Sequence, residues 1–127
     1  MKELIPLCVH TLIYDFFELR QSPTSNSMAP EISLRQPYNL KADVYSFTIL
    51  LYEVLTLEKA FRNWQTSEIY MKVNRKGVRP SISLFWSKRL KELVRSCWSP
   101  NPDDRLTMKK VEAALIDEVG DLQASMQ

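Results

Sequence analysis

Glycine is scarce in this chain of 127 residues, which holds two glycines, Gly77 and Gly120, against seven prolines. An all-β architecture depends on many tight turns, and tight turns draw heavily on glycine. The shortage therefore argues against an all-β fold. It favours helices that are joined by loops marked with proline.

Paired cysteines and clusters of metal-binding side chains are also missing. The two cysteines, Cys8 and Cys97, stand far apart, and no Cys-x-x-Cys motif occurs. His10 is the single histidine, so a zinc site built from these three residues is not expected. Two isolated thiols are typical of a reducing compartment, and we expect a cytoplasmic location.

The chain has neither a strong charge of one sign nor a long hydrophobic run. Its formal net charge is +2, so charge alone predicts neither a nucleic-acid partner nor a membrane partner. Residues 4–19 are apolar in patches, but Pro6, Asp15 and Glu18 interrupt them. This segment is too short and too polar to span a bilayer. We expect a protein with no nucleic-acid and no membrane partner.

What the sequence does contain fits one helical domain. A length of 127 residues suits a single domain, and 45% apolar with 25% charged residues is ordinary for a soluble globular protein. Residues 1–20 predict one or two short strands or a buried segment, and the small polar residues 21–27 predict a loop. Helices are expected at residues 30–35, 40–56, 66–76, 87–98 and 107–120, with N-caps at Asn39, at Thr66 or Ser67, at Ser87 and at Thr107, and with fraying at Gly120.

Residues 40–56 form the clearest of these predicted helices. Val44, Phe47, Leu51 and Leu55 give one apolar stripe, and further apolar side chains cover most of the remaining circumference. A helix that is apolar nearly all round belongs in the middle of a protein. We therefore expect neighbours on several of its sides.

Three motifs follow one another along the chain. Residues 28–31 read Met-Ala-Pro-Glu, residues 41–47 read Lys-Ala-Asp-Val-Tyr-Ser-Phe, and residues 97–105 read Cys-Trp-Ser-Pro-Asn-Pro-Asp-Asp-Arg. In this order and at this spacing they resemble the rear half of the helical lobe of a eukaryotic protein kinase domain. The Cys-Trp form and the segment before residue 31 resemble the tyrosine-kinase-like serine/threonine type.

The resemblance covers residues 23–117 and implies a mainly α fold. This fold is a helical C-lobe fragment of the protein kinase domain, built around one buried central helix. Residues 1–22 are then an uncertain N-terminal segment, with a short strand pair or a degenerate start of the activation segment. Residues 118–127 are a C-terminal tail.

The resemblance assigns structural roles to four residues. It implies a buried ion pair between Glu31 and Arg105, since either charge buried alone would cost several kcal/mol. It implies that Asp43 holds the catalytic loop of a complete kinase in shape and that Trp98 lies in the core. Taken alone, Glu31 could be a first-turn helix acid and Arg105 a solvated loop residue. The chain departs from the family pattern at Thr48, where glycine is usual, and at Leu106, where proline is usual.

Two further residues match the family only in part. Thr24 stands seven positions before Glu31, where serine/threonine kinases carry a threonine that helps to position the substrate. Alternatively, Thr24 is one of several hydroxyl residues in a polar loop, and its match to this position is a coincidence. Asp15-Phe16-Phe17 is similar to a decayed Asp-Phe-Gly motif, whose aspartate binds magnesium in active kinases. A chance match within an apolar stretch is the alternative for Asp15.

Phosphoryl transfer depends on positioning and on charge neutralisation, so a kinase needs several further parts. Two isolated glycines cannot form a glycine-rich loop, and no His-Arg-Asp string precedes residue 28. We therefore expect no catalytic and no cofactor-binding residue here, with ATP and magnesium bound only by the complete family domain. The expected function is a partial protein Ser/Thr kinase domain that is inactive as this chain. The alternative is a non-catalytic protein-interaction module derived from a kinase C-lobe.

The missing kinase segments also predict a partner. In the family, segments earlier in the chain cover one side of the central helix. Without them, we expect exposed apolar surface on the helix at residues 40–56 and an Asp43 carboxylate without a partner. Exposed apolar surface of this kind predicts a protein partner, or the missing kinase segments themselves.

Overall fold

The computed structural model describes residues 26–126, and every described element is helical. The strands expected within residues 1–20 lie outside this range. The elements, in chain order, are α2 (Pro30–Ser33), α3 (Lys41–Thr56), α4 (Thr66–Glu68), the π-helix η1 (Ile69–Arg75), α5 (Lys88–Cys97), the 3-10 helix η2 (Pro102–Asp104) and α6 (Met108–Ser125). The described part of the chain is therefore helical, as the resemblance implies.

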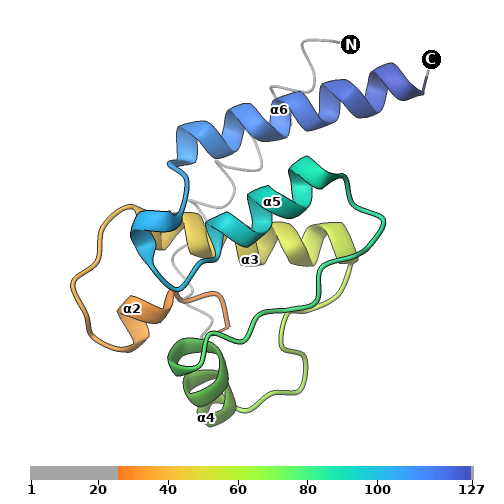
Figure 1. Ribbon diagram of the computed structural model, residues 1–127. Helices are drawn as coiled ribbons and strands as arrows, with labels where there is room; N and C mark the ends of the chain where they lie inside the picture. Colours follow the sequence, from red (N-terminus) through yellow and green to blue (C-terminus); the bar gives the residue numbers. More distant parts are fainter. Residues whose placement is uncertain (1–25, 127) are drawn as a thin grey trace.

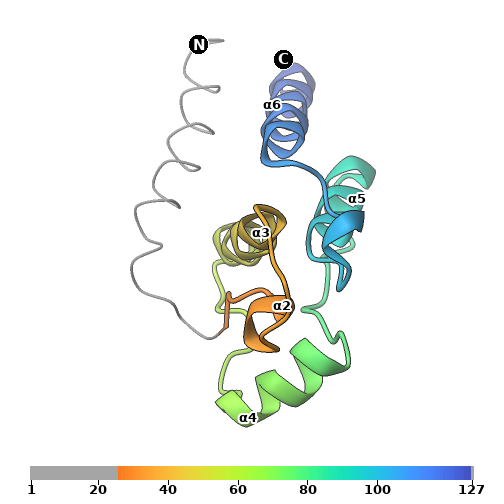
Figure 2. The same cartoon turned by 90° about the vertical axis from the view of Figure 1, so that its left-hand side faces the viewer.

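The helices are stacked around α3, which occupies the middle of the molecule (Figure 1). α5 packs against α3, and α6 packs against the other side of α5. α2 lies on the opposite side of α3 and contacts η1, so the pair α4 and η1 forms the far end of the stack (Figure 2). The central position predicted for residues 40–56 is confirmed.

Burial along α3 explains this central position. Val44, Tyr45, Phe47 and Ile49 are at most 1% exposed, so the helix is covered on several sides along its middle. Within residues 40–56, the exposed large apolar side chains lie at the two ends, with Leu40 before the first turn of α3 and Val54 and Leu55 near its last turn. The middle of the helix thus carries the hydrophobic core.

Side-chain caps set the starts of several helices. Ser87 Oγ accepts a hydrogen bond from Leu90 N at 3.1 Å, and Thr107 Oγ1 accepts one from Lys110 N at 3.3 Å, as predicted. Asn39 Oδ1 accepts from Lys41 N at 2.9 Å, although the residue that precedes the first helical turn is Leu40 rather than Asn39. This difference of one residue is ordinary at a helix end.

Two elements differ from the sequence predictions in length or type. The helix expected at residues 66–76 divides into a short α-helical turn and the π-helix η1, with Gln65 rather than Thr66 or Ser67 at its cap. α6 does not fray at Gly120 but continues to Ser125. The reason is tertiary, because Arg89 on α5 contacts Glu118 at 3.7 Å and Asp121 at 2.5 Å, on either side of the glycine.

Candidate functional site

The best-defined polar site is a buried ion pair between α2 and the residue that follows η2. Pro30 occupies the first helical position of α2 and thereby places Glu31 in the first turn, facing inward. Asn101 Oδ1 accepts a hydrogen bond from Asp103 N and shapes η2, after which Arg105 turns toward α2. Glu31 is 3% exposed and Arg105 is 2% exposed.

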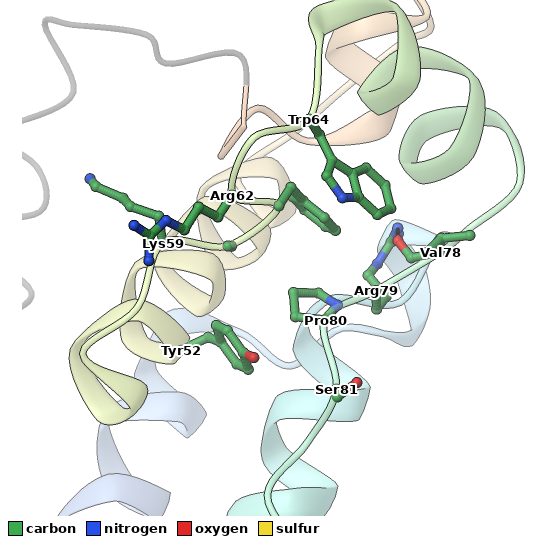
Figure 3. A pocket seen from close by; sticks show the side chains of 10 residues that line it. Tyr52, Lys59, Arg62, Trp64, Val78, Arg79, Pro80 and Ser81 are labelled. Atoms are coloured by element: carbon green, nitrogen blue, oxygen red, sulfur yellow. Dashed lines mark hydrogen bonds between the residues drawn. The ribbon is translucent and has the colours of Figure 1, made fainter.

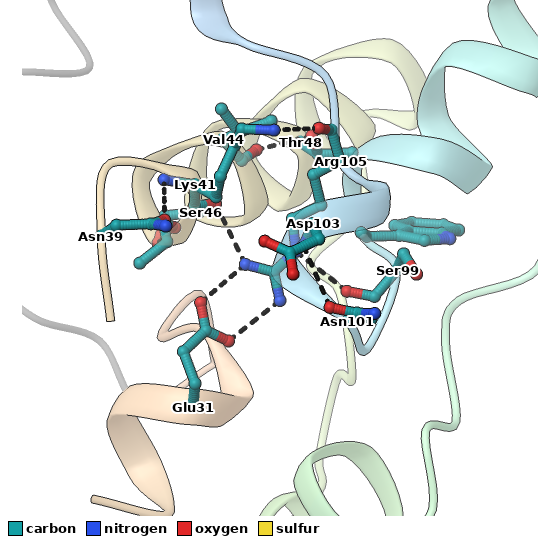
Figure 4. A network of polar contacts seen from close by, with 12 residues as sticks. Glu31, Asn39, Lys41, Val44, Ser46, Thr48, Ser99, Asn101, Asp103 and Arg105 are labelled. Carbon is teal, nitrogen blue, oxygen red and sulfur yellow. Dashed lines mark hydrogen bonds and ion pairs between the residues drawn. The ribbon is translucent and has the colours of Figure 1, made fainter. Parts of the chain in front are cut away.

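The two side chains meet in a bidentate arrangement (Figure 4). Arg105 Nη1 donates to Glu31 Oε1 at 2.7 Å, and Arg105 Nη2 donates to Glu31 Oε2 at 2.9 Å. The planar guanidinium matches the carboxylate in two places, a geometry that lysine could not reproduce. The contact that the motif resemblance implies for Glu31 and Arg105 is thus present.

Backbone carbonyls accept further hydrogen bonds from Arg105. Arg105 Nε donates to the Ser99 carbonyl at 2.9 Å, and Nη1 also donates to the Lys41 carbonyl at 3.0 Å. In return, Lys41 Nζ donates to the Arg105 carbonyl. The guanidinium of Arg105 therefore joins three parts of the chain in one network: α2, the start of α3 and the loop that follows α5 (Figure 4).

Tyr45 on α3 adds an aromatic face to this network. Arg105 Cζ lies 5.2 Å from the ring centroid of Tyr45, and Arg79 Cζ lies 5.0 Å from it, both within range of a cation–π interaction. Burial raises the pKa of the Tyr45 phenol above its ordinary value, although the two guanidinium groups act in the opposite direction. Tyr45 therefore stays neutral and serves as a packing surface for the two cations.

Arg79 links the network to the loop that follows η1. Its Nε donates to the Trp98 carbonyl at 2.7 Å, and its Nη1 donates to the Val73 carbonyl at 3.0 Å. Trp98 itself is 4% exposed and packs near Tyr52, with ring centroids 5.9 Å apart. Trp98 and Cys97 both lie in the core, and burial raises the pKa of the Cys97 thiol.

The remaining predicted site residues are less well defined. Asp43 lies in the first turn of α3, half-buried, and it is not left without a partner, so the expectation of an unpaired carboxylate is wrong. Asp15 and Thr24 fall outside the described residues.

Within residues 26–126, no group of three or more His, Cys, Asp or Glu side chains is placed to hold a metal ion. In the same range no helix is both long and apolar enough to cross a membrane.

Sequence reasoning missed three members of the network. Lys41 and Tyr45 belong to the quoted motif at residues 41–47, but the motif alone does not say that their atoms reach Arg105. Arg79 carries no motif, and only its position before Pro80 marks it as part of a loop. In chemical terms the site pairs one carboxylate with one guanidinium and several carbonyls, an arrangement that fixes segments relative to one another.

Comparison with known proteins agrees with this geometry. Residues 18–115 match the family described as protein tyrosine and serine/threonine kinase. The chain is 34% identical over 103 residues to the dual specificity protein kinase shkE of Dictyostelium discoideum, a match that covers 80% of this chain and 14% of that protein. It is 35% identical over 104 residues to the serine/threonine-protein kinase STY17 of Arabidopsis thaliana, which covers 80% of this chain and 18% of that protein.

A third relative gives the same picture. The chain is 35% identical over 88 residues to the serine/threonine/tyrosine-protein kinase HT1 of Arabidopsis thaliana, a match that covers 69% of this chain and 23% of that protein. The chain thus spans less than a quarter of the length of each of these relatives.

Proposed function

This chain belongs to the protein tyrosine and serine/threonine kinase family, of the tyrosine-kinase-like type, and we propose that it is the rear portion of a kinase helical lobe that does not transfer phosphate by itself. Its role in this proposal is to hold the end of the activation segment, α2, against α3. ATP and magnesium then act only where the other parts of a kinase domain are present.

The observation that carries the proposal is the Glu31–Arg105 ion pair. It joins residues that are 74 positions apart, and both lie within the motifs that the family resemblance selected. Chance similarity in composition would not bring these two side chains into a buried bidentate contact. The pair therefore supports a kinase-type helical lobe rather than an unrelated helical domain.

The positions of the two glycines support the proposal that this chain does not transfer phosphate by itself. Gly77 ends η1 with a φ of 75°, and Gly120 lies inside α6. Both are used in the helical architecture, so neither belongs to a loop that cradles phosphates.

An assay of the purified 127-residue chain tests this proposal. The chain is incubated with radiolabelled ATP, magnesium and casein, and the phosphate incorporated into protein is counted. We expect incorporation no greater than that of a heat-unfolded sample. Turnover that the Asp15→Ala substitution abolishes would contradict the proposal, because it would show that a working magnesium aspartate is present.

A second candidate function is a non-catalytic interaction module. The observation that favours it is the exposed apolar surface at the end of α3, where Val54 and Leu55 are 46% and 41% exposed and Leu57 is 90% exposed. Exposed apolar side chains close together at one end of a helix suit a protein partner or further kinase segments. Under this reading the same ion pair would stabilise a docking scaffold.

A further inference from the structure

A pocket of about 260 Å³ lies beside the end of α3, between the two loops that follow α3 and η1. Figure 3 shows the side chains that line it, among them Lys59, Arg62 and Arg79. The charged ends of Lys59 and Arg62 point away from Arg79, so the pocket does not bring its cations onto one ligand. From here the pocket-lining loop, residues 78–81, leads along the end of α3 toward α5 (Figure 1).

Two large apolar side chains stand out from the turn just before α5. Leu84 is 87% exposed and Phe85 is 99% exposed. The turn is nevertheless fixed, because Ser83 Oγ accepts a hydrogen bond from Phe85 N at 3.2 Å. Trp86 ties the turn to the core, with its ring centroid 6.1 Å from that of Tyr52 on α3. Because the turn is already ordered, covering its two apolar side chains with a partner costs little further conformational entropy.

The C-terminal part of α6 presents a second exposed apolar surface. The buried side chains of α6 are Val111, Leu115 and Glu118, which recur every three or four residues on one face. The same face continues at helical spacing to Leu122 and Met126, which are 55% and 86% exposed. Figure 1 shows the reason, because α6 runs past the start of α5, the helix that covers its earlier turns. α6 therefore overhangs α5 with a partly exposed apolar face.

Contacts of Arg89 place the two apolar surfaces at the same end of the molecule. Arg89 Nη1, in the first turn of α5, lies 2.5 Å from Asp121 Oδ2 and 3.7 Å from Glu118 Oε2. Asp121 directly precedes Leu122, and Arg89 follows Phe85 by four positions. The end face of the molecule thus comprises four exposed apolar side chains: Leu84, Phe85, Leu122 and Met126.

Charges of opposite sign flank the two halves of the end face. The half formed by the turn is basic, because no acidic residue occurs between Glu68 and Glu92 and the Lys88 side chain is 90% exposed. The ion pair of Lys88 with Glu92 is 3.9 Å long and exposed, so it holds Lys88 only weakly. The half formed by α6 is acidic, because Asp117 and Asp121 lie one turn apart and are both exposed.

Two halves of this kind complement each other under twofold symmetry. A half-turn rotation places the basic half of one copy on the acidic half of another, and it makes the same contact a second time. We propose that two copies of this chain pair through the end face, with Phe85 of one copy packed against Leu122 and Met126 of the other. Lys88 of each copy then lies opposite Asp117 of the other. Pairing through this face neither requires nor excludes phosphoryl transfer.

Sedimentation equilibrium of the full 127-residue chain tests this proposal. Between about 1 and 500 μM we expect a reversible monomer–dimer equilibrium with a micromolar dissociation constant, because the end face is small. Phe85→Ser and Leu122→Ser should each weaken pairing by about tenfold or more, since each change removes an apolar contact from both halves of the interface. The matched control is Leu40→Ser, at a side chain that is 82% exposed before the other end of α3. It should leave the dissociation constant within about twofold of the original value.

Mixing of charge-reversed chains tests how the two copies are oriented. Lys88→Glu and Asp117→Lys should each weaken pairing by about threefold or more, because each change places like charges opposite one another. An equimolar mixture of the two variants should recover the original affinity, because both charged contacts of the mixed dimer again join opposite signs. Circular dichroism shows whether each variant remains folded.

Three results would overturn the proposal. A chain that stays monomeric up to the highest concentration would show that a second copy is not the occupant of the end face. Equal weakening by Leu40→Ser and Phe85→Ser would place the contact elsewhere. A mixture of the two charge variants that associates no better than either variant alone would exclude the twofold pairing.

Discussion

The position of α2 depends on a few residues that contact Arg105. α2 has four residues, and a helix of that length has no stability of its own. Glu31 provides its link to the core through the two hydrogen bonds with Arg105. A buried pair of this kind costs much more when one partner is removed than an exposed pair does.

We therefore expect Glu31→Gln to lower the free energy of unfolding by about 3–5 kcal/mol, because the Arg105 charge remains buried without a counter-charge. Urea denaturation followed by circular dichroism measures the change. The matched control is Glu92→Gln, which removes an exposed i,i+4 pair with Lys88 at 3.9 Å. The control should cost less than about 1 kcal/mol. Equal losses for both variants would show that the buried pair is not a stabilising anchor.

At the scale of elements, the end of η1 shows how one residue stops a helix. Gly77 adopts a φ of 75°, its N–H donates to the Val73 carbonyl at 3.1 Å, and Val78 N donates to the Lys72 carbonyl at 2.9 Å. These bonds satisfy two carbonyls in the final turn of η1 and turn the chain toward Arg79. The position of the pocket-lining loop thus follows from a backbone conformation that glycine adopts most readily.

Replacing each of the two glycines with alanine should have opposite effects on stability. Gly77→Ala should destabilise the protein by about 1–2 kcal/mol, because an added Cβ is strained at positive φ even though Pro100 Cγ would be 3.5 Å away, an ordinary contact. Gly120→Ala should stabilise it by up to about 1 kcal/mol, because α6 is continuous there and the new methyl group meets no atom within 4 Å. Midpoints of thermal unfolding measure both changes. Shifts in the same direction would refute the assigned backbone conformations.

At the scale of the whole molecule, α3 lies between the α5 and α6 side and the α2 and η1 end of the stack. It contacts α5 and η2 directly, α5 carries α6, and α2 contacts η1 at the other end of the stack. The rings of Trp86 and Trp98 lie 6.1 and 5.9 Å from the ring of Tyr52 on α3, and Trp64 packs on Phe61, so tryptophan fluorescence reports on the surroundings of α3. A core that is shared in this way should unfold as one unit.

We expect tryptophan fluorescence and far-ultraviolet circular dichroism to give coincident urea unfolding curves. Ile49→Ala opens a cavity in the fully buried part of α3. It should lower the free energy of unfolding obtained from both curves by about 2–5 kcal/mol. The control Leu57→Ala, at a side chain that is 90% exposed, should change stability by about 0.5 kcal/mol or less. Two separate transitions would contradict the picture of a single core around α3.

Local signals in the sequence predicted the main helices well. The apolar circumference of residues 40–56 predicted a central helix, and Ser87 and Thr107 predicted two starts, because periodicity and capping act within a few residues. The end of α6 was predicted wrongly at Gly120. A glycine inside a helix costs about 1 kcal/mol, and the contacts of Arg89 with Glu118 and Asp121 carry the helix past it.

By itself, the sequence determined the helical class and the order of the helices, and its resemblance to the kinase family implied that Glu31 and Arg105 meet. Tertiary structure alone decided that Arg79 and Arg105 would share the ring of Tyr45, and that Lys59 and Arg62 would line a pocket with Arg79. The physical reason is distance along the chain. Caps and periodicity follow from bonds between near neighbours, whereas side chains on separate loops come together only when the packing of α3 against α5 fixes their backbones.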